Sequence, residues 1–112
     1  MMANAELPPA IRAFIDTTNR GDTEGFVASF TDDAYLNDWG REFRGHDGVR
    51  SWDSTDNIGK QSRFSDVSVA NGTEPDSYDV TLTVTGNGHN GSGTLKFQLR
   101  DGLIQSLVIP ES

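Results

Sequence analysis

Three carboxylates, those of Asp38, Asp53 and Asp56, are the side chains of this sequence whose types and spacing could do chemistry. Asp38 closes a stretch of alternating polar and apolar residues, and Asp53 and Asp56 lie in a segment with helical periodicity. A carboxyl group that is removed from water has a raised pKa and can then take up or release a proton near neutral pH. General acid–base catalysis is therefore the chemistry that this set could support.

Asp38 is the strongest candidate of the three. In an extended strand from Ala34 to Trp39, it shares one face with Ala34 and Leu36. If Leu36 looks into the protein, Asp38 does as well, and its carboxylate is desolvated. Two interpretations stay open at this point. Asp38 is either a general acid or base, or it caps a turn in water because the strand ends near Asn37.

The other two carboxylates depend on a helix that we expect to begin at His46 or Asp47 and to end near Asn57. One side of this helix carries Val49, Trp52, Asp53 and Asp56, at offsets of 3, 4 and 7. At least one of Asp53 and Asp56 could border a cavity. A solvated helix edge is the alternative, and for Asp56 it is the simpler interpretation. Trp52 is either core or pocket wall. Trp39, next to Asp38, is either a ligand-facing aromatic or part of an interface.

The elements before these residues are predicted to be two helices. Apolar residues recur at helical spacing from Leu7 to Thr18, which predicts a helix from Pro9 to Arg20 that is capped by Gly21. Asp22 is a good N-cap for a second, short helix. Its apolar face is Phe26, Val27 and Phe30, and residues 31–33 are expected to end it. Residues 40–45 are expected to form a turn with a little extended chain.

The second half of the chain is predicted to consist of strands. From Ser62 onward apolar and polar residues alternate, and the last segment, 103–109, is apolar enough to be covered on both faces. Hairpin signals separate these runs: Asn71-Gly72, a glycine-rich stretch that contains Asn90-Gly91, and Asp101-Gly102. Helices followed by an antiparallel meander of four strands indicate a single α+β domain over residues 1–112.

Composition and motifs exclude several function classes. The net charge of −8 disfavours nucleic acid and anionic membranes, and the absence of Cys removes disulfides and a thiol nucleophile. No apolar run or basic leader predicts a membrane span or a signal peptide, so we expect a cytoplasmic protein. Gly86, Gly88 and Gly91 spell G-x-G-x-x-G, but a strand follows, which predicts a hairpin loop. His46 is expected to start a helix and His89 to lie at a loop tip, with no metal site.

Three segments together resemble one family. They are residues 14–22 (FIDTTNRGD), 30–38 (FTDDAYLND) and 43–52 (FRGHDGVRSW). They are similar to the nuclear-transport-factor-2-like superfamily, and within it to the SnoaL-like and ketosteroid-isomerase-like proteins. The resemblance implies a cone-shaped α+β barrel, in which three N-terminal helices close a strongly curved, mainly antiparallel sheet over one deep pocket. It also implies homodimers joined through the outer face of the sheet.

The resemblance also carries expectations about chemistry. Catalytic members act on small apolar molecules such as steroids, polyketides and terpene epoxides, without a metal or an organic cofactor. Asp38 falls where ketosteroid isomerases keep the carboxylate that moves a proton. Their oxyanion-hole tyrosine aligns with Phe14 and their second acid with Leu95, so both oxyanion donors are missing here. Epoxide hydrolases of this fold use an acid–Arg–acid arrangement, for which Asp38 and Asp53 could supply the acids. No arginine can be placed between them from the sequence.

Three hypotheses follow. In the first, the protein is a cofactor-free isomerase, cyclase or hydrolase with Asp38 as general base; for a cyclase, His89 or Asp53 could be the second group. In the second, the pocket binds a small apolar ligand without catalysis. In the third, a homodimeric interaction module fills its pocket with its own aromatic residues, including Phe26. The candidate pocket residues are Phe14, Phe30, Trp39, Trp52, Asp53, Leu82, Leu95 and Phe97.

Overall fold

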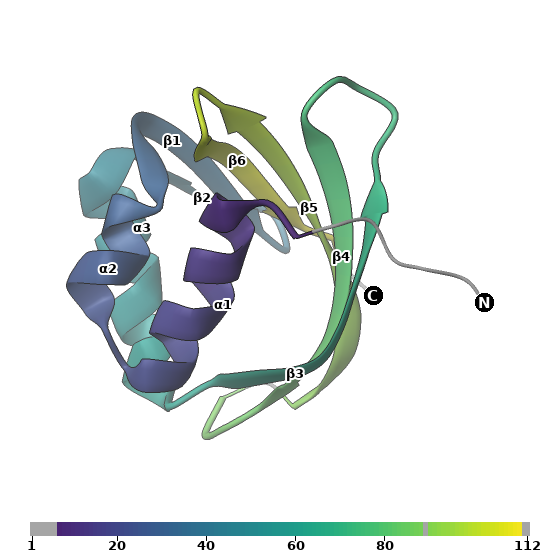
Figure 1. The fold of residues 1–112 in the computed structure, drawn as a ribbon. Helices are drawn as coiled ribbons and strands as arrows, with labels where there is room; N and C mark the ends of the chain where they lie inside the picture. Colours follow the sequence, from purple (N-terminus) through teal and green to yellow (C-terminus); the bar gives the residue numbers. More distant parts are fainter. Residues whose placement is uncertain (1–6, 89, 111–112) are drawn as a thin grey trace.

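Three helices pack on one face of a six-stranded sheet that is strongly curved and not closed (Figure 1). The computed structural model describes residues 7–88 and 90–110, so the expectation for His89 lies outside the described residues. The strand order is β2-β1-β6-β5-β4-β3. In chain order the elements are α1 (Pro9–Arg20), α2 (Thr23–Ala28), β1 (Phe30–Asp38), β2 (Arg41–Arg44), α3 (Gly45–Asp56), a 3₁₀ turn (Ile58–Lys60), β3 (Arg63–Asn71), β4 (Ser77–Thr85), β5 (Gly91–Arg100) and β6 (Leu103–Ile109).

The first helix begins and ends, and the second helix begins, where the sequence predicts. Pro9 occupies the first turn of α1, and Gly21 closes the helix in the left-handed conformation, with φ 73°. The Asp22 carboxylate caps α2 by accepting a hydrogen bond of 3.0 Å from the Gly25 backbone N–H. This bond lowers the pKa of Asp22 below its usual value.

The predicted end of the second helix is wrong. Helix α2 ends at Ala28, and Phe30 begins strand β1, so residues 30–33 are extended and not helical. The reason is long-range pairing: Ser29 accepts a backbone hydrogen bond from Ile104, and Phe30 pairs with Ile104 on β6. Helical periodicity in a local window does not register a partner that lies more than 70 residues away.

The β3–β6 meander is confirmed, with every successive pair antiparallel. The pairing of β1 with β6 is parallel, which makes the sheet mixed. Residues 41–44, expected as part of a turn, form strand β2, which pairs antiparallel with β1. Gly86 and Gly88 lie in the loop between β4 and β5, and Gly91 opens β5, so the glycine motif is a hairpin loop as expected.

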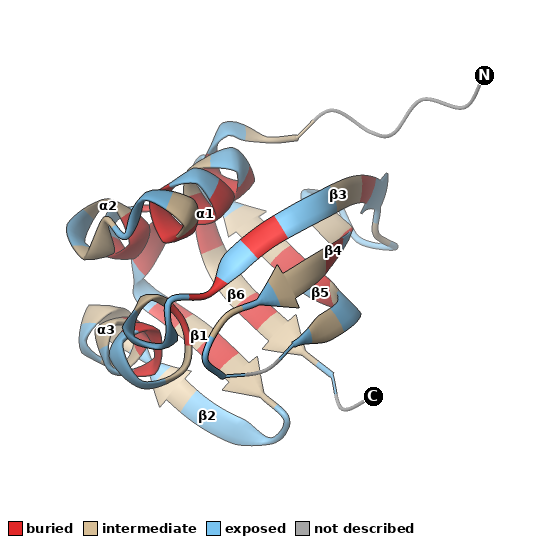
Figure 2. Cartoon of the chain, turned by 90° about the horizontal axis from the view of Figure 1, so that it is seen from below, coloured by how far each residue is buried: buried red, intermediate tan, exposed pale blue. Residues whose placement is uncertain are grey.

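The core lies between the helices and the inner face of the sheet (Figure 2). Phe14 is its centre, with 0% of its surface exposed. Its ring centroid lies 5.2 Å from those of Phe26 and Phe97 and 5.4 Å from that of Phe64. No helix in the described part of the chain is long and apolar enough to cross a membrane.

Candidate functional site

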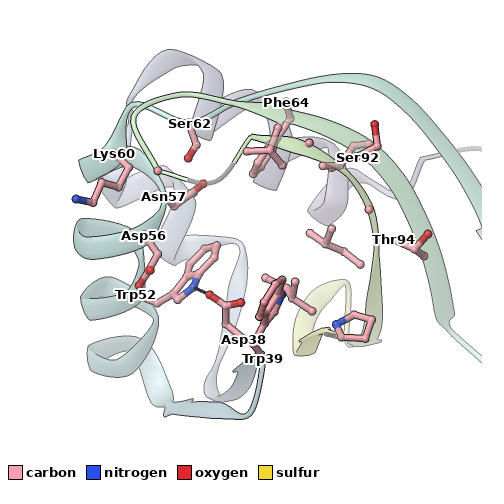
Figure 3. A pocket seen from close by; sticks show the side chains of 18 of the residues that line it. Asp38, Trp39, Trp52, Asp56, Asn57, Lys60, Ser62, Phe64, Ser92 and Thr94 are labelled. Atoms are coloured by element: carbon pink, nitrogen blue, oxygen red, sulfur yellow. Dashed lines mark hydrogen bonds between the residues drawn. The ribbon is translucent and has the colours of Figure 1, made fainter. Parts of the chain in front are cut away.

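A cavity of about 420 Å³ opens between α3, the inner face of β3–β5 and the ends of β1 and β6 (Figure 3). Its walls are mainly apolar, with polar groups confined to a few places. Such a volume suits a small organic molecule, because ligand sites in proteins span roughly 300–1,000 Å³. The residues that line it include Asp38, Trp39, Arg41, Trp52, Asp56, Asn57, Ser62, Phe64, Leu82, Gly93 and Leu95.

Asp38 closes strand β1 and points toward the cavity (Figure 3). Ala34 and Leu36, on the same face of the strand, are both 0% exposed, and the Asp38 side chain is 16% exposed. Its Oδ2 accepts hydrogen bonds from Trp52 Nε1 at 2.9 Å and from the Arg41 guanidinium at 2.7 Å. Within the described residues no group donates to Oδ1, so this oxygen is left to accept a proton or a hydrogen bond from a ligand.

A two-residue turn places Arg41 directly opposite Asp38. Trp39 and Gly40 have φ values of 56° and 90°, the pattern of a type I′ hairpin turn, and Asp38 and Arg41 are register partners across it. The turn is held to β6 by a hydrogen bond of 3.0 Å from the Trp39 backbone N–H to Ile109. The short turn therefore keeps the Arg41 guanidinium beside the Asp38 carboxylate.

Arg41 also contacts a second carboxylate, that of Asp56 at the end of α3. One guanidinium nitrogen lies 3.0 Å from Asp56 Oδ1 and the other 3.4 Å from Oδ2. The hydrogen bonds to Asp56, followed by the charge of Asp38, raise the pKa of Arg41. The structure therefore contains an acid–Arg–acid arrangement, with Asp38 and Asp56 as the acids. Asp56 is not a purely solvated helix edge, since its side chain is only 26% exposed.

The candidate pocket residues from the sequence divide into two groups. Trp39, Trp52, Leu82 and Leu95 line the cavity together with Asp38. Phe14, Phe30 and Phe97 are at most 2% exposed and pack against other aromatic rings in the core instead. Alternation along a strand indicates which residues face inward, but it does not tell whether they meet a helix or an open volume.

Asp53 lies behind the cavity and not on its wall. It is 0% exposed and joins α2 to the end of α3 and the 3₁₀ turn. Its oxygens accept hydrogen bonds from Thr23 Oγ1 at 3.1 Å and Asn57 Nδ2 at 3.0 Å, and weakly from the Ile58 backbone N–H at 3.4 Å. Burial raises the pKa of Asp53, and these hydrogen bonds oppose the shift. Asp53 therefore positions neighbouring groups, while Asp56 occupies the place beside Arg41.

Sequence reasoning missed Arg41, Asn57 and Ser62 as lining residues. The signal for Arg41 was present in the sequence, because Asp38-Trp-Gly-Arg41 has a glycine at the second turn position of a two-residue hairpin. Asn57 and Ser62 flank the 3₁₀ turn after α3, and no pattern in the sequence marks them. Among the described residues, no group of three or more His, Asp or Glu side chains is placed to hold a metal ion.

Solved structures with the same fold include three of particular relevance. A proposed polyketide cyclase from Sinorhizobium meliloti is 23% identical, with a TM-score of 0.82 over 92% of this chain and 94% of that chain. The Δ5-3-ketosteroid isomerase from a Mycobacterium species is 20% identical, with a TM-score of 0.76 over 92% and 90%. SalBIII is an epoxide hydrolase/cyclase-like enzyme with a role in pyran ring formation in the polyether salinomycin. It is 19% identical, with a TM-score of 0.78 over 90% of this chain and 86% of that chain.

The sequence itself assigns the family. Among curated protein sequences, none matches this chain significantly. The model of the SnoaL-like domain matches residues 11–107, which include most of α1, all of α2, the acid–Arg–acid arrangement and nearly all of the meander. With the order of elements and the fold in agreement, this chain belongs to the SnoaL-like domain family, within the nuclear-transport-factor-2-like superfamily.

Proposed function

We propose that the protein is a cofactor-free hydrolase or cyclase that opens the epoxide ring of a small apolar molecule, with Asp38 as general base. The observation that carries the proposal is the pair of carboxylates, Asp38 and Asp56, bound to one guanidinium beside an apolar cavity. An epoxide needs one group that takes a proton from the nucleophile and another that gives a proton to the ring oxygen. The two carboxyl groups on Arg41 supply both.

The reaction proceeds in one displacement. The nucleophile is a water molecule or a hydroxyl group of the substrate. Asp38 Oδ1 takes a proton from this nucleophile while the oxygen of the nucleophile attacks a ring carbon. The C–O bond of the epoxide breaks, and its oxygen receives a proton from Asp56 in the carboxylic acid form. The product is a diol when water is the nucleophile, and a cyclic ether when a hydroxyl group of the substrate is the nucleophile. Solvent at the exposed side of Arg41 then returns the proton from Asp38 to Asp56.

Arg41 and Trp52 keep this carboxyl pair in position. The Arg41 guanidinium binds both carboxyl groups, and Trp52 Nε1 directs Oδ2 of Asp38 away from the nucleophile. Two carboxyl groups that share one proton and one guanidinium carry no net charge. Such a neutral group is compatible with the mainly apolar cavity, where an isolated charge would be strongly disfavoured.

Steroid isomerisation is a weaker candidate for this cavity. An isomerase needs donors that stabilise an enolate oxygen, and loss of one such donor commonly lowers the rate by about 100- to 1000-fold. Phe14 has no hydroxyl and lies in the core, and Leu95 on the wall is apolar. An epoxide needs no enolate stabilisation, so the groups that are present suffice for ring opening.

Product analysis with a panel of epoxides tests the proposal. Cycloalkene and terpene epoxides are incubated with the protein in ¹⁸O-labelled water, and mass spectrometry follows the gain of one labelled oxygen. We expect Asp38→Asn to abolish the product while ligand affinity is retained, and the exposed Asp47→Asn on α3 to behave like the wild type. Saturable binding without product would instead favour a ligand-binding protein. A panel with no binding would favour the interaction module, against which the open cavity already counts.

We also propose that two chains associate through the outer face of the sheet. On β4 and β5 that face carries small polar side chains: the hydroxyls of Thr81 and Thr94 lie 2.9 Å apart and those of Thr83 and Ser92 3.0 Å apart. The charge of Lys96 is paired there with the Asp79 carboxylate. Light scattering on the purified protein tests this. A dimer that dissociates in Thr81→Arg supports the proposal, and a monomeric wild type overturns it.

A further inference from the structure

The amide of Asn57 presents an unsatisfied oxygen to the cavity. The residue is 1% exposed, and its Nδ2 donates to Asp53 Oδ1 at 3.0 Å and to Thr18 Oγ1 at 2.9 Å. Because the Asp53 carboxylate accepts hydrogen bonds and cannot donate them when ionised, these contacts fix which end of the amide is the nitrogen. The oxygen Oδ1 therefore points the other way, into the cavity (Figure 3).

This oxygen has no partner in the described part of the chain, and neither has the hydroxyl of Ser62. Every fully buried side-chain nitrogen or oxygen among the described residues has a hydrogen-bond partner. Asn57 Oδ1 and Ser62 Oγ have none, so both atoms border open volume although their residues are 1% and 4% exposed. Ser62 is held next to Asn57 by a backbone hydrogen bond of 3.1 Å from its N–H to the Asn57 carbonyl.

The cavity is thus polar at two ends. Asp38 lies at one end, and Asn57 and Ser62 lie at the other, with Trp52 along the wall between them (Figure 3). The remaining wall is mainly apolar and includes Phe64, Leu82 and Leu95, and Asp56, Lys60, Ser92 and Thr94 also line the cavity. An acceptor that is buried and unpaired is unfavourable, which is why such groups in proteins usually meet a water or a ligand.

We infer that Asn57 Oδ1 and Ser62 Oγ form a second polar subsite, which binds a hydroxyl group of the ligand at the end remote from the reacting carbon. The hydroxyl donates to Asn57 Oδ1 and accepts from Ser62 Oγ. The inference rests on the proposed function, since it takes Asp38 as the reacting end. The ligand class is then an apolar ring compound with one hydroxyl group opposite its epoxide. A site built to hydrogen-bond a hydroxyl discriminates strongly against the analogue that lacks it.

Matched pairs of ligands test this subsite. The probes are terpene epoxides and bicyclic ketones, each with and without a hydroxyl group at the end opposite the epoxide or the carbonyl, and their dissociation constants are measured by calorimetry. We expect wild-type protein to bind the hydroxylated member of at least one pair about tenfold more tightly. Asn57→Ala should lose this preference and bind the deoxy member as before.

A second variant covers the case in which Asn57→Ala fails to fold, because its amide also joins α1 to α3. Ser62→Ala removes only the hydroxyl that donates to the ligand and should reduce the preference several-fold. Ser54→Ala is the matched control, since the Ser54 hydroxyl donates to the Ser51 carbonyl on the exposed side of α3. The control should keep the full preference.

The failure of this inference differs from the failure of the proposed function. If both members of every pair bind equally well to wild type, or the preference survives in Ser62→Ala and Asn57→Ala, the subsite is overturned and the role of Asp38 is untouched. A crystal structure in which a water stays on Asn57 Oδ1 beside the hydroxylated ligand overturns it too. If no ligand of either kind binds, the proposed function and the subsite both fail.

Discussion

Trp52 donates a hydrogen bond of 2.9 Å from its indole nitrogen to Oδ2 of Asp38. The bond joins the middle of α3 to the last residue of β1, so the candidate base is fixed between two elements that are separated along the chain by strand β2. Trp52 itself is held by stacking on Phe26, with ring centroids 6.0 Å apart. The position of Asp38 therefore depends on the core packing of a helix that carries Asp56 one turn further on.

Arg41→Lys is expected to remove turnover while the fold is retained. Lysine keeps the charge but cannot bind two carboxylates through a planar fork. We expect kcat to fall at least about 100-fold. Because Arg41 is 54% exposed, its ion pairs add little stability, and Tm should hardly change. Arg44→Lys on the same strand is the control. A variant with normal kcat would show that Arg41 has no part in the reaction.

The pH dependence of stability should report on Asp53. Burial raises its pKa above 3.8, so the folded chain binds this proton more tightly than the unfolded chain does. The resulting stabilisation of the folded chain is complete below pH 3.8 and is lost as the pH rises through the raised pKa of Asp53. As the pH rises from 3.8 through the raised pKa, urea unfolding of Asp53→Asn should show a smaller loss of stability than that of the wild type. An unchanged pH profile would contradict the assigned shift.

Phe14→Tyr should not recover an oxyanion hole. The Phe14 ring is surrounded by other phenylalanine rings and is 0% exposed, so a hydroxyl there would enter the core. A buried hydroxyl without a partner costs about 1–3 kcal/mol, which chemical denaturation measures directly. Isomerase activity toward a steroid ketone should stay absent. Activity gained by this variant would mean that position 14 reaches the ligand.

Gly93 should set the size of the ligand. It pairs with the inward-facing Leu82, and a Cβ built on it would meet no atom within 4 Å. Gly93→Leu should therefore fill part of the cavity and weaken binding of the larger ligands selectively. Stability should be equal or higher, because glycine within a strand is unfavourable by roughly 0.5–1 kcal/mol. Asp16→Leu on the exposed side of α1 is the control. Equal loss of small and large ligands would argue against a filled cavity.

Local signals in the sequence predicted much of the fold. Pro9, Gly21 and Asp22 mark helix ends by their backbone preferences alone, and Asp101-Gly102 forms a hairpin turn with two positive φ values. The inward face of Asp38 followed from alternation with Leu36. These features depend on neighbours within a few residues, which is the range that sequence patterns describe.

The parts that could not be predicted depend on long-range contacts. Phe30 is a strand residue because β6 pairs with it, and Asp56 meets Arg41 only after α3 packs beside the β1–β2 hairpin. The core position of Phe14, as opposed to the cavity wall, is decided by how far the helices cover the sheet. Asn57 became a candidate only once its amide partners, Asp53 and Thr18, were known.

The two-residue turn between β1 and β2 makes half of the candidate site a continuous tetrapeptide, Asp38-Trp-Gly-Arg41. The carboxylate and its counter-ion are neighbours along the chain. The pair can therefore be kept while sequences diverge, without a compensating change in a distant segment. Asp-x-Gly-Arg at the end of the first strand, followed by an aspartate about fifteen residues later, is thus a search signature. It can separate relatives that carry this charge arrangement from those that share only the fold.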